Sequence, residues 1–195
     1  MTVTRHSGAA LLIALLLAGC AGTQRDTAPP SPRKQERLAA VKADPAEAVR
    51  ILNAYRAGKG LGPVRLDSTL TAMAQRQSDA MAASDDLSHS AAGSFNSRVN
   101  AAGLDTVRAA ENLGAGYYST QEAFDGWKKS SGHEANLSMP QATRIGLALA
   151  KNPQTRYGAW WTLVLAGDPE KRREMSAGPL VPVLGGTTFR WGAPL

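Results

Sequence analysis

Two histidines and one glutamate are the residues of this sequence best suited to chemistry. His89 lies in "DLSHSAAG", Glu111 in "RAAENLGAGYY" and His133 in "SSGHEAN". A carboxylate among apolar and small residues is costly to bury unless it is paired or hydrogen-bonded, and imidazoles are suitable partners. The three side chains could also hold zinc and leave its fourth coordination position to water. Their wide separation in sequence leaves the geometry to the fold.

Three interpretations of His133 follow from its surroundings. It could be a structural histidine hydrogen-bonded to Glu111, a ligand or metal contact in a binding cleft, or a catalytic residue. The chain has no G-x-S-x-G nucleophile elbow, and Leu137 stands where H-E-x-x-H needs its second histidine. If chemistry occurs, its best version is water activated by a metal on His89 and His133, with Glu111 as general base.

The N-terminus has the pattern of a bacterial lipoprotein signal. Residues 1–19 carry Arg5 before an apolar run that is too short to span a bilayer, and His6 would leave with this segment. The tetrad Leu17-Ala18-Gly19-Cys20 resembles a lipobox, whose cysteine becomes the lipidated first residue. Because Cys20 is the only cysteine, we predict no disulfide and a palmitate-type lipid anchor in the cell envelope. In a two-membrane envelope, the non-acidic Ala21 favours the outer membrane.

Composition divides the rest of the chain into three parts. Residues 20–43, rich in Pro, Ser, Thr and charge, are predicted to form the lipidated N-terminus and a flexible linker. Residues 44–166 form one domain with a sizeable core, expected to be monomeric. Residues 167–195 are expected to be an irregular C-terminal extension, although "GTTFRWG" alternates enough to add an edge strand.

The formal net charge of +6 is scattered, and its only clusters, "RKQER" and "EKRRE", lie in the two tails. A nucleic-acid partner is not expected for an exported protein. We interpret the charge as a solvated face, and attraction to anionic lipid or wall polymers is the alternative.

Four helices are expected in the domain. The first begins with Asp44 as N-cap and Pro45 at the first helical position, and it ends at Gly58 and Gly60. The second starts after Asp67. Its apolar face follows helical spacing and comprises Leu70, Met73, Ala74, Gln77 and Met81. Shorter helices are expected over 94–102 and 120–129.

Two strands have a different pattern, because "RIGLALA" and "GAWWTLVLA" are apolar at successive positions. Both faces of these strands should therefore be covered. The intervening "NPQTRYG" is typical of a tight reversal, which predicts an antiparallel pair. The fold class that satisfies these constraints is α+β, a three-layer α-β-α sandwich with a small, mainly antiparallel central sheet.

From about Val49 to Ala166 the chain resembles the CAP superfamily (cysteine-rich secretory proteins, antigen 5, pathogenesis-related 1; SCP domains) in its cysteine-poor bacterial form. The matching pieces occur in order: Asn53 and Arg56 in an N-x-x-R helix, "LSH" followed by Arg98, "AENLGAG", "AFDGWKKSSGHEANL", "IGLALA" and "WWTLVLA".

This resemblance implies a cleft lined by two histidines and two glutamates, which bind a divalent metal in some members. His89, Glu111 and His133 match three of the four, and the second glutamate falls on Ser130, as is common in bacterial members. We assign Asn112 to the same cleft. Ala110 replaces the usual glycine before the glutamate, so a turn at that point would lack the conformational freedom of glycine.

The resulting prediction is a lipid-anchored envelope protein whose CAP domain binds a small or extended ligand, such as a lipid, a metal or an envelope component. One alternative is a metal-dependent hydrolase, with zinc as the expected ion, acting on an envelope polymer or peptide. Another is a structural or partner-binding surface module with a vestigial cleft.

Overall fold

A computed structural model of the chain describes residues 29–106, 108–168, 180–182 and 188–190. The signal segment, the lipobox and most of the C-terminal extension lie outside these residues. Within the described part of the chain, no helix combines the length and apolar character needed to cross a bilayer.

Short polar caps set the starts of the long helices. The Asp44 carboxylate accepts a hydrogen bond from the Glu47 backbone N–H at 2.9 Å, and Pro45 follows the cap. Asp67 caps its helix in the same way. The expected helices over 45–57, after Asp67, over 94–102 and over 120–129 are confirmed. The observed helices are α1 (Pro32–Ala40), α2 (Pro45–Ala57), α3 (Ser68–Ser84), α4 (Phe95–Ala101), α5 (Thr120–Lys128) and α6 (Ser131–Leu137).

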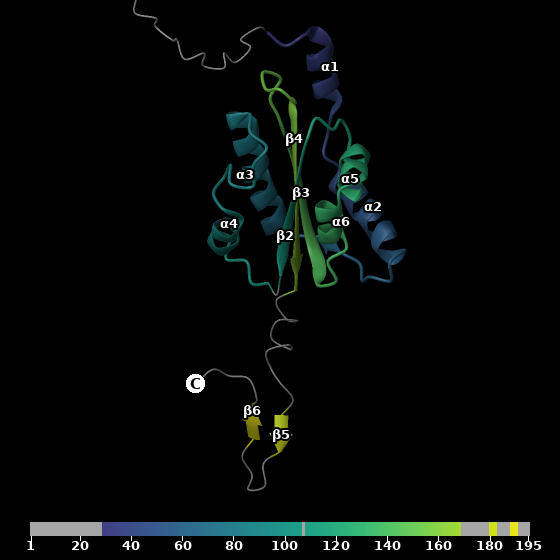
Figure 1. Cartoon of the computed structure of the whole chain (residues 1–195), viewed down its shortest axis with the longest axis vertical. Helices are drawn as coiled ribbons and strands as arrows, with labels where there is room; N and C mark the ends of the chain where they lie inside the picture. Colours follow the sequence, from purple (N-terminus) through teal and green to yellow (C-terminus); the bar gives the residue numbers. More distant parts are fainter. Residues whose placement is uncertain (1–28, 107, 169–179, 183–187, 191–195) are drawn as a thin grey trace, which may run out of the picture.

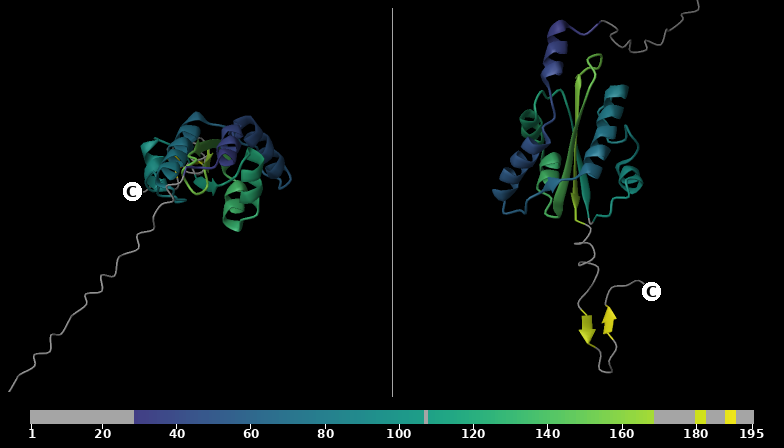
Figure 2. Two further views of the ribbon diagram at one scale, coloured as in Figure 1. Left: turned by 90° about the horizontal axis from the view of Figure 1, so that it is seen from above. Right: turned by 180° about the vertical axis from the view of Figure 1, so that it is seen from behind.

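The central sheet has the strand order β1-β3-β4-β2 and is antiparallel except for the β1–β3 pair. Its strands are β1 (Arg65–Leu66), β2 (Ala109–Ala115), β3 (Ala142–Lys151) and β4 (Ala159–Gly167). Helices α3 and α4 lie on one side of the sheet, and α2, α5 and α6 lie on the other (Figures 1 and 2). The expected α-β-α sandwich with a small, mainly antiparallel sheet is confirmed, including the β3–β4 hairpin.

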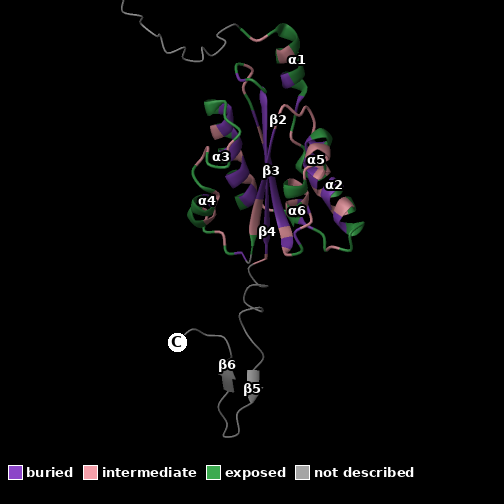
Figure 3. Ribbon diagram, viewed as in Figure 1, coloured by how far each residue is buried: buried purple, intermediate pink, exposed green. Residues whose placement is uncertain are grey.

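The sheet is buried on both faces because its central strands carry apolar side chains at successive positions (Figure 3). Neighbouring side chains of a strand point to opposite faces. Trp161 accordingly belongs to the core cluster that contains Trp127, while Trp160 belongs to the cluster that contains Met81. Gly146 of β3 lies directly beneath the backbone of α3, so a Cβ there would overlap the helix.

Residues 32–40 differ from the flexible linker expected over 20–43. Ser31 caps α1 by accepting from the Lys34 backbone N–H at 3.3 Å, and Leu38 is only 3% exposed. Leu38 packs against Gly158 in the turn between β3 and β4, which brings α1 to the tip of that hairpin (Figure 1). One apolar side chain therefore docks this helix, although the segment lacks a periodic apolar face.

The C-terminal segment forms β5 (Leu180–Pro182) and β6 (Thr188–Arg190), which pair antiparallel in a sheet of their own. A strand within "GTTFRWG" is thus confirmed. Its expected place at the edge of the main sheet is wrong, because its partner is β5.

Candidate functional site

Glu111 projects from β2, an edge strand of the sheet, and its side chain is 2% exposed. The preceding Ala110 pairs with Leu165 of β4 as ordinary extended backbone. The expected turn at Ala110 is therefore wrong, and glycine is not needed there. β2 was not predicted, because its small and polar residues, "AAENLGA", give no strong strand pattern.

His89 reaches Glu111 from the loop between α3 and α4. Its Nδ1 lies 2.8 Å from a Glu111 carboxylate oxygen, and 60% of its side chain is exposed. Gln77, buried on α3, holds this loop by donating to the Ser88 carbonyl at 2.7 Å and accepting from the Ala92 N–H at 3.3 Å. The loop geometry that positions the imidazole is therefore fixed from the core.

Arg98 of α4 is the principal partner of Glu111, a role that sequence reasoning missed. Its guanidinium donates to the two carboxylate oxygens at 2.7 and 2.9 Å, and the arginine is 6% exposed. It also donates to the backbone carbonyls of His89 and Gly93. The rule that a buried carboxylate needs a partner could have identified Arg98, since it is the only basic residue in 94–102.

His133 lies within α6, a helix that is not among those predicted from the sequence. The side-chain amide of Asn112 donates to the His133 carbonyl at 3.1 Å, and Asn136 donates to the Asn112 side-chain oxygen at 2.9 Å. These contacts fasten α6 to β2 beside Glu111. Burial lowers the pKa of the His133 imidazole, and the charge of nearby His89 lowers it further.

The structure brings the predicted residues to one place, with one difference in their pairing. Glu111 hydrogen-bonds to His89 and Arg98 through its side chain. Of the three interpretations of His133, the one with a hydrogen bond to Glu111 is therefore wrong. Asn112 is buried, with its amide engaged by α6. Ser130 is the half-buried N-cap residue of α6 and makes no side-chain cap bond. Ligand contacts by these residues stay a prediction.

Glu134, the neighbour of His133, faces the other way. Its carboxylate accepts hydrogen bonds from the Tyr55 hydroxyl at 2.6 Å, the Lys59 ammonium at 2.8 Å and the Ser138 hydroxyl at 2.7 Å. These donors, with Lys59 first, lower its pKa to about 2. Glu134 therefore ties α6 to α2 and lies outside the cluster.

The arrangement does not fit a zinc centre built from His89, Glu111 and His133. Arg98 occupies both carboxylate oxygens of Glu111, and its fixed positive charge would repel a divalent cation. Within the described parts of the chain, no group of three His, Cys, Asp or Glu residues is placed to hold a metal. Metal contact by the two imidazoles stays a prediction.

Comparison with known proteins gives a consistent result. Residues 49–165 match the model of the cysteine-rich secretory protein family, CAP. The protein YkwD of Bacillus subtilis (strain 168) is 27% identical over 156 residues, which are 75% of this chain and 59% of that protein.

Solved structures show the same fold at lower sequence identity. An extracellular SCP-domain protein from Bacillus anthracis (TM-score 0.55, 22% identity) covers 73% of this chain, which spans 45% of that one. An outer surface protein of Borrelia burgdorferi has the same TM-score at 18% identity, covering 66% of this chain and 98% of its own. The chain thus spans less than two thirds of the Bacillus proteins.

Proposed function

This chain belongs to the cysteine-rich secretory protein family, CAP, and from that premise we propose that it is a lipid-anchored binding module of the cell envelope. The binding site is the cluster of His89, Glu111, Arg98 and His133, and its ligand is a small or extended envelope molecule that is held without being transformed.

The pairing of Glu111 with Arg98 is the observation that carries this proposal. A general base must reach the proton that it removes, and its lone pairs must be available. Both oxygens of Glu111 already accept charge-assisted bonds, and the side chain is 2% exposed. The carboxylate is therefore better suited to holding the site rigid than to moving protons.

The imidazoles remain as the groups that a ligand can meet. His89 is largely exposed, and its Nδ1 is fixed by Glu111, which leaves the other ring nitrogen for a ligand. The lowered pKa of His133 favours its neutral ring, which can donate one hydrogen bond and accept another. These two imidazoles suit a polar, uncharged or weakly acidic group of the ligand.

The envelope location rests on the N-terminal sequence and on the similar proteins. Cys20 is the last residue of a lipobox-like tetrad, and the structurally similar chains include an extracellular protein and an outer surface protein. Cys20→Ser should release the full chain from the membrane fraction, measured by cell fractionation and immunoblotting. Retention of the variant in that fraction would contradict anchoring at this residue.

Ligand binding is tested by native mass spectrometry of the full chain extracted from membranes in mild detergent, with metal analysis of the same sample. We expect a bound molecule on the wild type that is lost from the double variant His89→Asn/His133→Asn. Arg76→Gln, an exposed change on α3, serves as the control and should keep it. Stoichiometric zinc lost with the histidines would instead support the hydrolase alternative. A bound molecule kept by the double variant would contradict the site.

A further inference from the structure

A second candidate site lies at the N-terminal end of α1, which precedes residues 49–165 matched by the family model. A cavity of about 380 Å³ opens between α1 and Tyr118. Its lining is Ser31, Arg33, Lys34, Arg37 and Tyr118. Three of the five lining side chains are therefore cationic, and none is acidic.

Within the described part of the chain, Arg33, Lys34 and Arg37 lack acidic partners. Among residues 29–106 and 108–168, the ion pairs within 4.0 Å do not include Arg33, Lys34 or Arg37. The first turn of α1 contains no acidic residue, so Arg33 and Lys34 add positive charge to the positive end of the helix dipole. These positive charges repel one another, and a bound anion would offset the repulsion.

Two of the cationic side chains in this pocket are held in place by contacts within the protein. The Arg37 guanidinium stacks on the Tyr118 ring at 3.8 Å from its centroid, and Lys34 donates one hydrogen bond to the Thr155 carbonyl at 2.6 Å. Each of these side chains keeps further N–H donors. A guanidinium fork and an ammonium are the groups that proteins use to bind phosphate oxygens.

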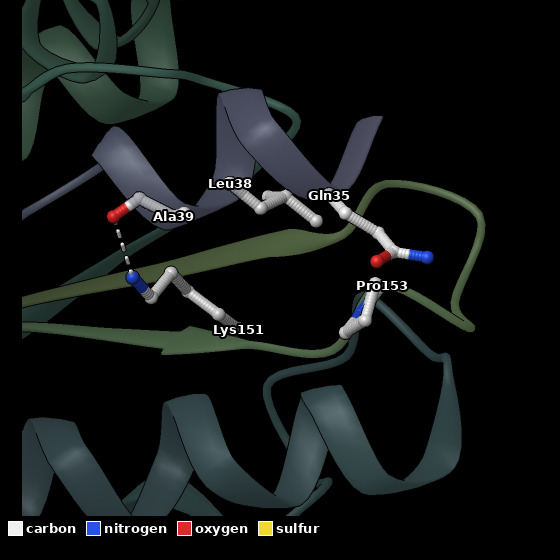
Figure 4. Close-up of a pocket in the computed structure, with 5 residues that line it drawn as sticks. All are labelled: Gln35, Leu38, Ala39, Lys151 and Pro153. Atoms are coloured by element: carbon white, nitrogen blue, oxygen red, sulfur yellow. Dashed lines mark hydrogen bonds between the residues drawn. The ribbon is translucent and has the colours of Figure 1, made fainter. Parts of the chain in front are cut away.

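Another cavity on α1 has fewer groups that could recognise a ligand (Figure 4). It measures about 240 Å³ and is lined by Gln35, Leu38, Ala39, Lys151 and Pro153. The Lys151 ammonium is directed to the carbonyls of Ala39 and Val41, at 3.5 and 3.1 Å, rather than to a ligand. The charged pocket is therefore the stronger candidate.

We propose that the pocket lined by Arg33, Lys34, Arg37 and Tyr118 binds a phosphate group, and that this phosphate belongs to the headgroup of an anionic membrane phospholipid. Basic residues near a membrane surface are attracted to anionic lipids. Tyrosine is enriched where a protein meets the interface between membrane and water. The pocket begins eleven residues after Cys20, within about 40 Å of extended chain, but the proposal does not require lipidation.

The test is flotation of the full chain with vesicles of phosphatidylcholine alone or with added phosphatidylglycerol. The pocket variant is Arg33→Gln/Lys34→Gln/Arg37→Gln. Its control is Arg76→Gln/Arg108→Gln/Lys129→Gln. This variant also loses two arginines and one lysine, but from exposed positions outside the pocket. All three chains share residues 1–28, so attachment through that segment is common to them.

We expect the wild type to prefer the anionic vesicles and the pocket variant to lose about a hundredfold in binding to them. The control should lose no more than about tenfold. Equal losses in the two variants would overturn the proposal, because they would show diffuse attraction. Binding of inorganic phosphate, followed by NMR, without binding of anionic vesicles would overturn the lipid assignment.

The single variant Arg33→Gln controls for an effect on folding, because the Arg33 side chain makes no hydrogen bond or ion pair with the described residues. It should weaken binding to anionic vesicles about fivefold at an unchanged melting temperature. Unchanged binding by this variant would contradict a role for Arg33 in the pocket.

Discussion

Arg56 and Arg98 are both buried arginines, but they lie on opposite sides of the sheet and bond to different groups. Arg56 of α2 is 0% exposed and donates to the carbonyls of Gly62, Leu137, Met139 and Ala142 at 2.8 to 3.0 Å. Arg98 of α4 forks onto the carboxylate of Glu111. One cation is satisfied by backbone alone, and the other is neutralised by an acid.

These partners give Arg56 a structural role and Arg98 a role in the candidate functional site. Arg56 ties the segments on either side of the α6–β3 connection to α2, and burial lowers the pKa of its guanidinium. It leaves no polar group facing outwards. Arg98 fixes an acid whose other contact is the exposed imidazole of His89. A buried arginine therefore indicates a site only when its partner carries a group to the surface.

The strongest test of this contrast is Arg56→Met. It would remove the guanidinium donors from three buried carbonyls and from the part-buried carbonyl of Gly62. We therefore expect a loss of about 5 kcal/mol in the free energy of unfolding and a melting temperature lower by about 15 °C. Arg56→Lys, with three donors, should lose less. The control is Arg50→Met on the same helix, whose side chain is 72% exposed. Thermal melts that agree for Arg50→Met and Arg56→Met would contradict the structural role of Arg56.

Glu111→Gln should have the next largest effect. It leaves the buried Arg98 cation unpaired, which costs about 3 kcal/mol, and denaturant unfolding would measure it. Glu36→Gln, at an exposed position of α1, is the matched control. In a double-mutant cycle, the addition of Arg98→Met should restore part of the loss. Strictly additive effects would show that the ion pair does not couple the two residues.

The pH dependence of His133 tests the same comparison. Burial lowers the pKa of the His133 imidazole, and the charge of His89, the exposed contact of the Arg98–Glu111 pair, lowers it further. The folded pKa of His133 is lowered from 6.5, so the folded state favours the neutral ring. The associated stability is present above about pH 6.5 and is lost as the pH falls through the folded pKa. We expect the melting temperature to decrease over this window in the wild type and to change less in His133→Gln. By NMR, His89→Gln should raise the His133 pKa. An unmoved His133 pKa would contradict their proximity.

The Glu134–Lys59 ion pair should have the smallest effect on stability. The side chains of Glu134 and Lys59 are 29% and 42% exposed, so solvent screens their charges. The Glu134 pKa of about 2 lies below the ordinary 4.5. The small stabilisation is present above about pH 4.5 and is lost as the pH falls towards 2. Lys59→Gln should raise the Glu134 pKa in an NMR titration, whereas Lys129→Gln should not. Equal shifts in both variants would point to net charge rather than to this contact.

The sequence predicted the elements with strong local patterns. Caps such as Asp44 and the continuous apolar runs of β3 and β4 leave few structural alternatives. β2 and α6 were missed because "AAENLGA" and "SGHEANL" are short and mostly small or polar. Their structure is imposed by tertiary contacts, namely pairing with β4 and the Asn112–His133 bond.

The candidate site was predicted in its members but not in its pairing. His89 and Glu111 meet as expected, whereas Arg98 was noted only as part of a motif. Bond partners depend on the register of β2 against β4 and on the loop held by Gln77, which no local pattern encodes. Composition can therefore show that a buried acid needs a partner, while only the fold selects it.

Because α1 docks at the β3–β4 tip, the two ends of the segment from α1 to β4 lie at opposite ends of the sheet. The chain enters at this tip, and β4 runs from there to Gly167 at the far end of the sheet (Figure 1). Nine residues of strand span roughly 30 Å. The folded domain therefore separates the two ends of this segment by the length of the sheet. A force applied between α1 and Gly167 would act along β4, and the hydrogen bonds of β4 to β3 and to β2 would share the load.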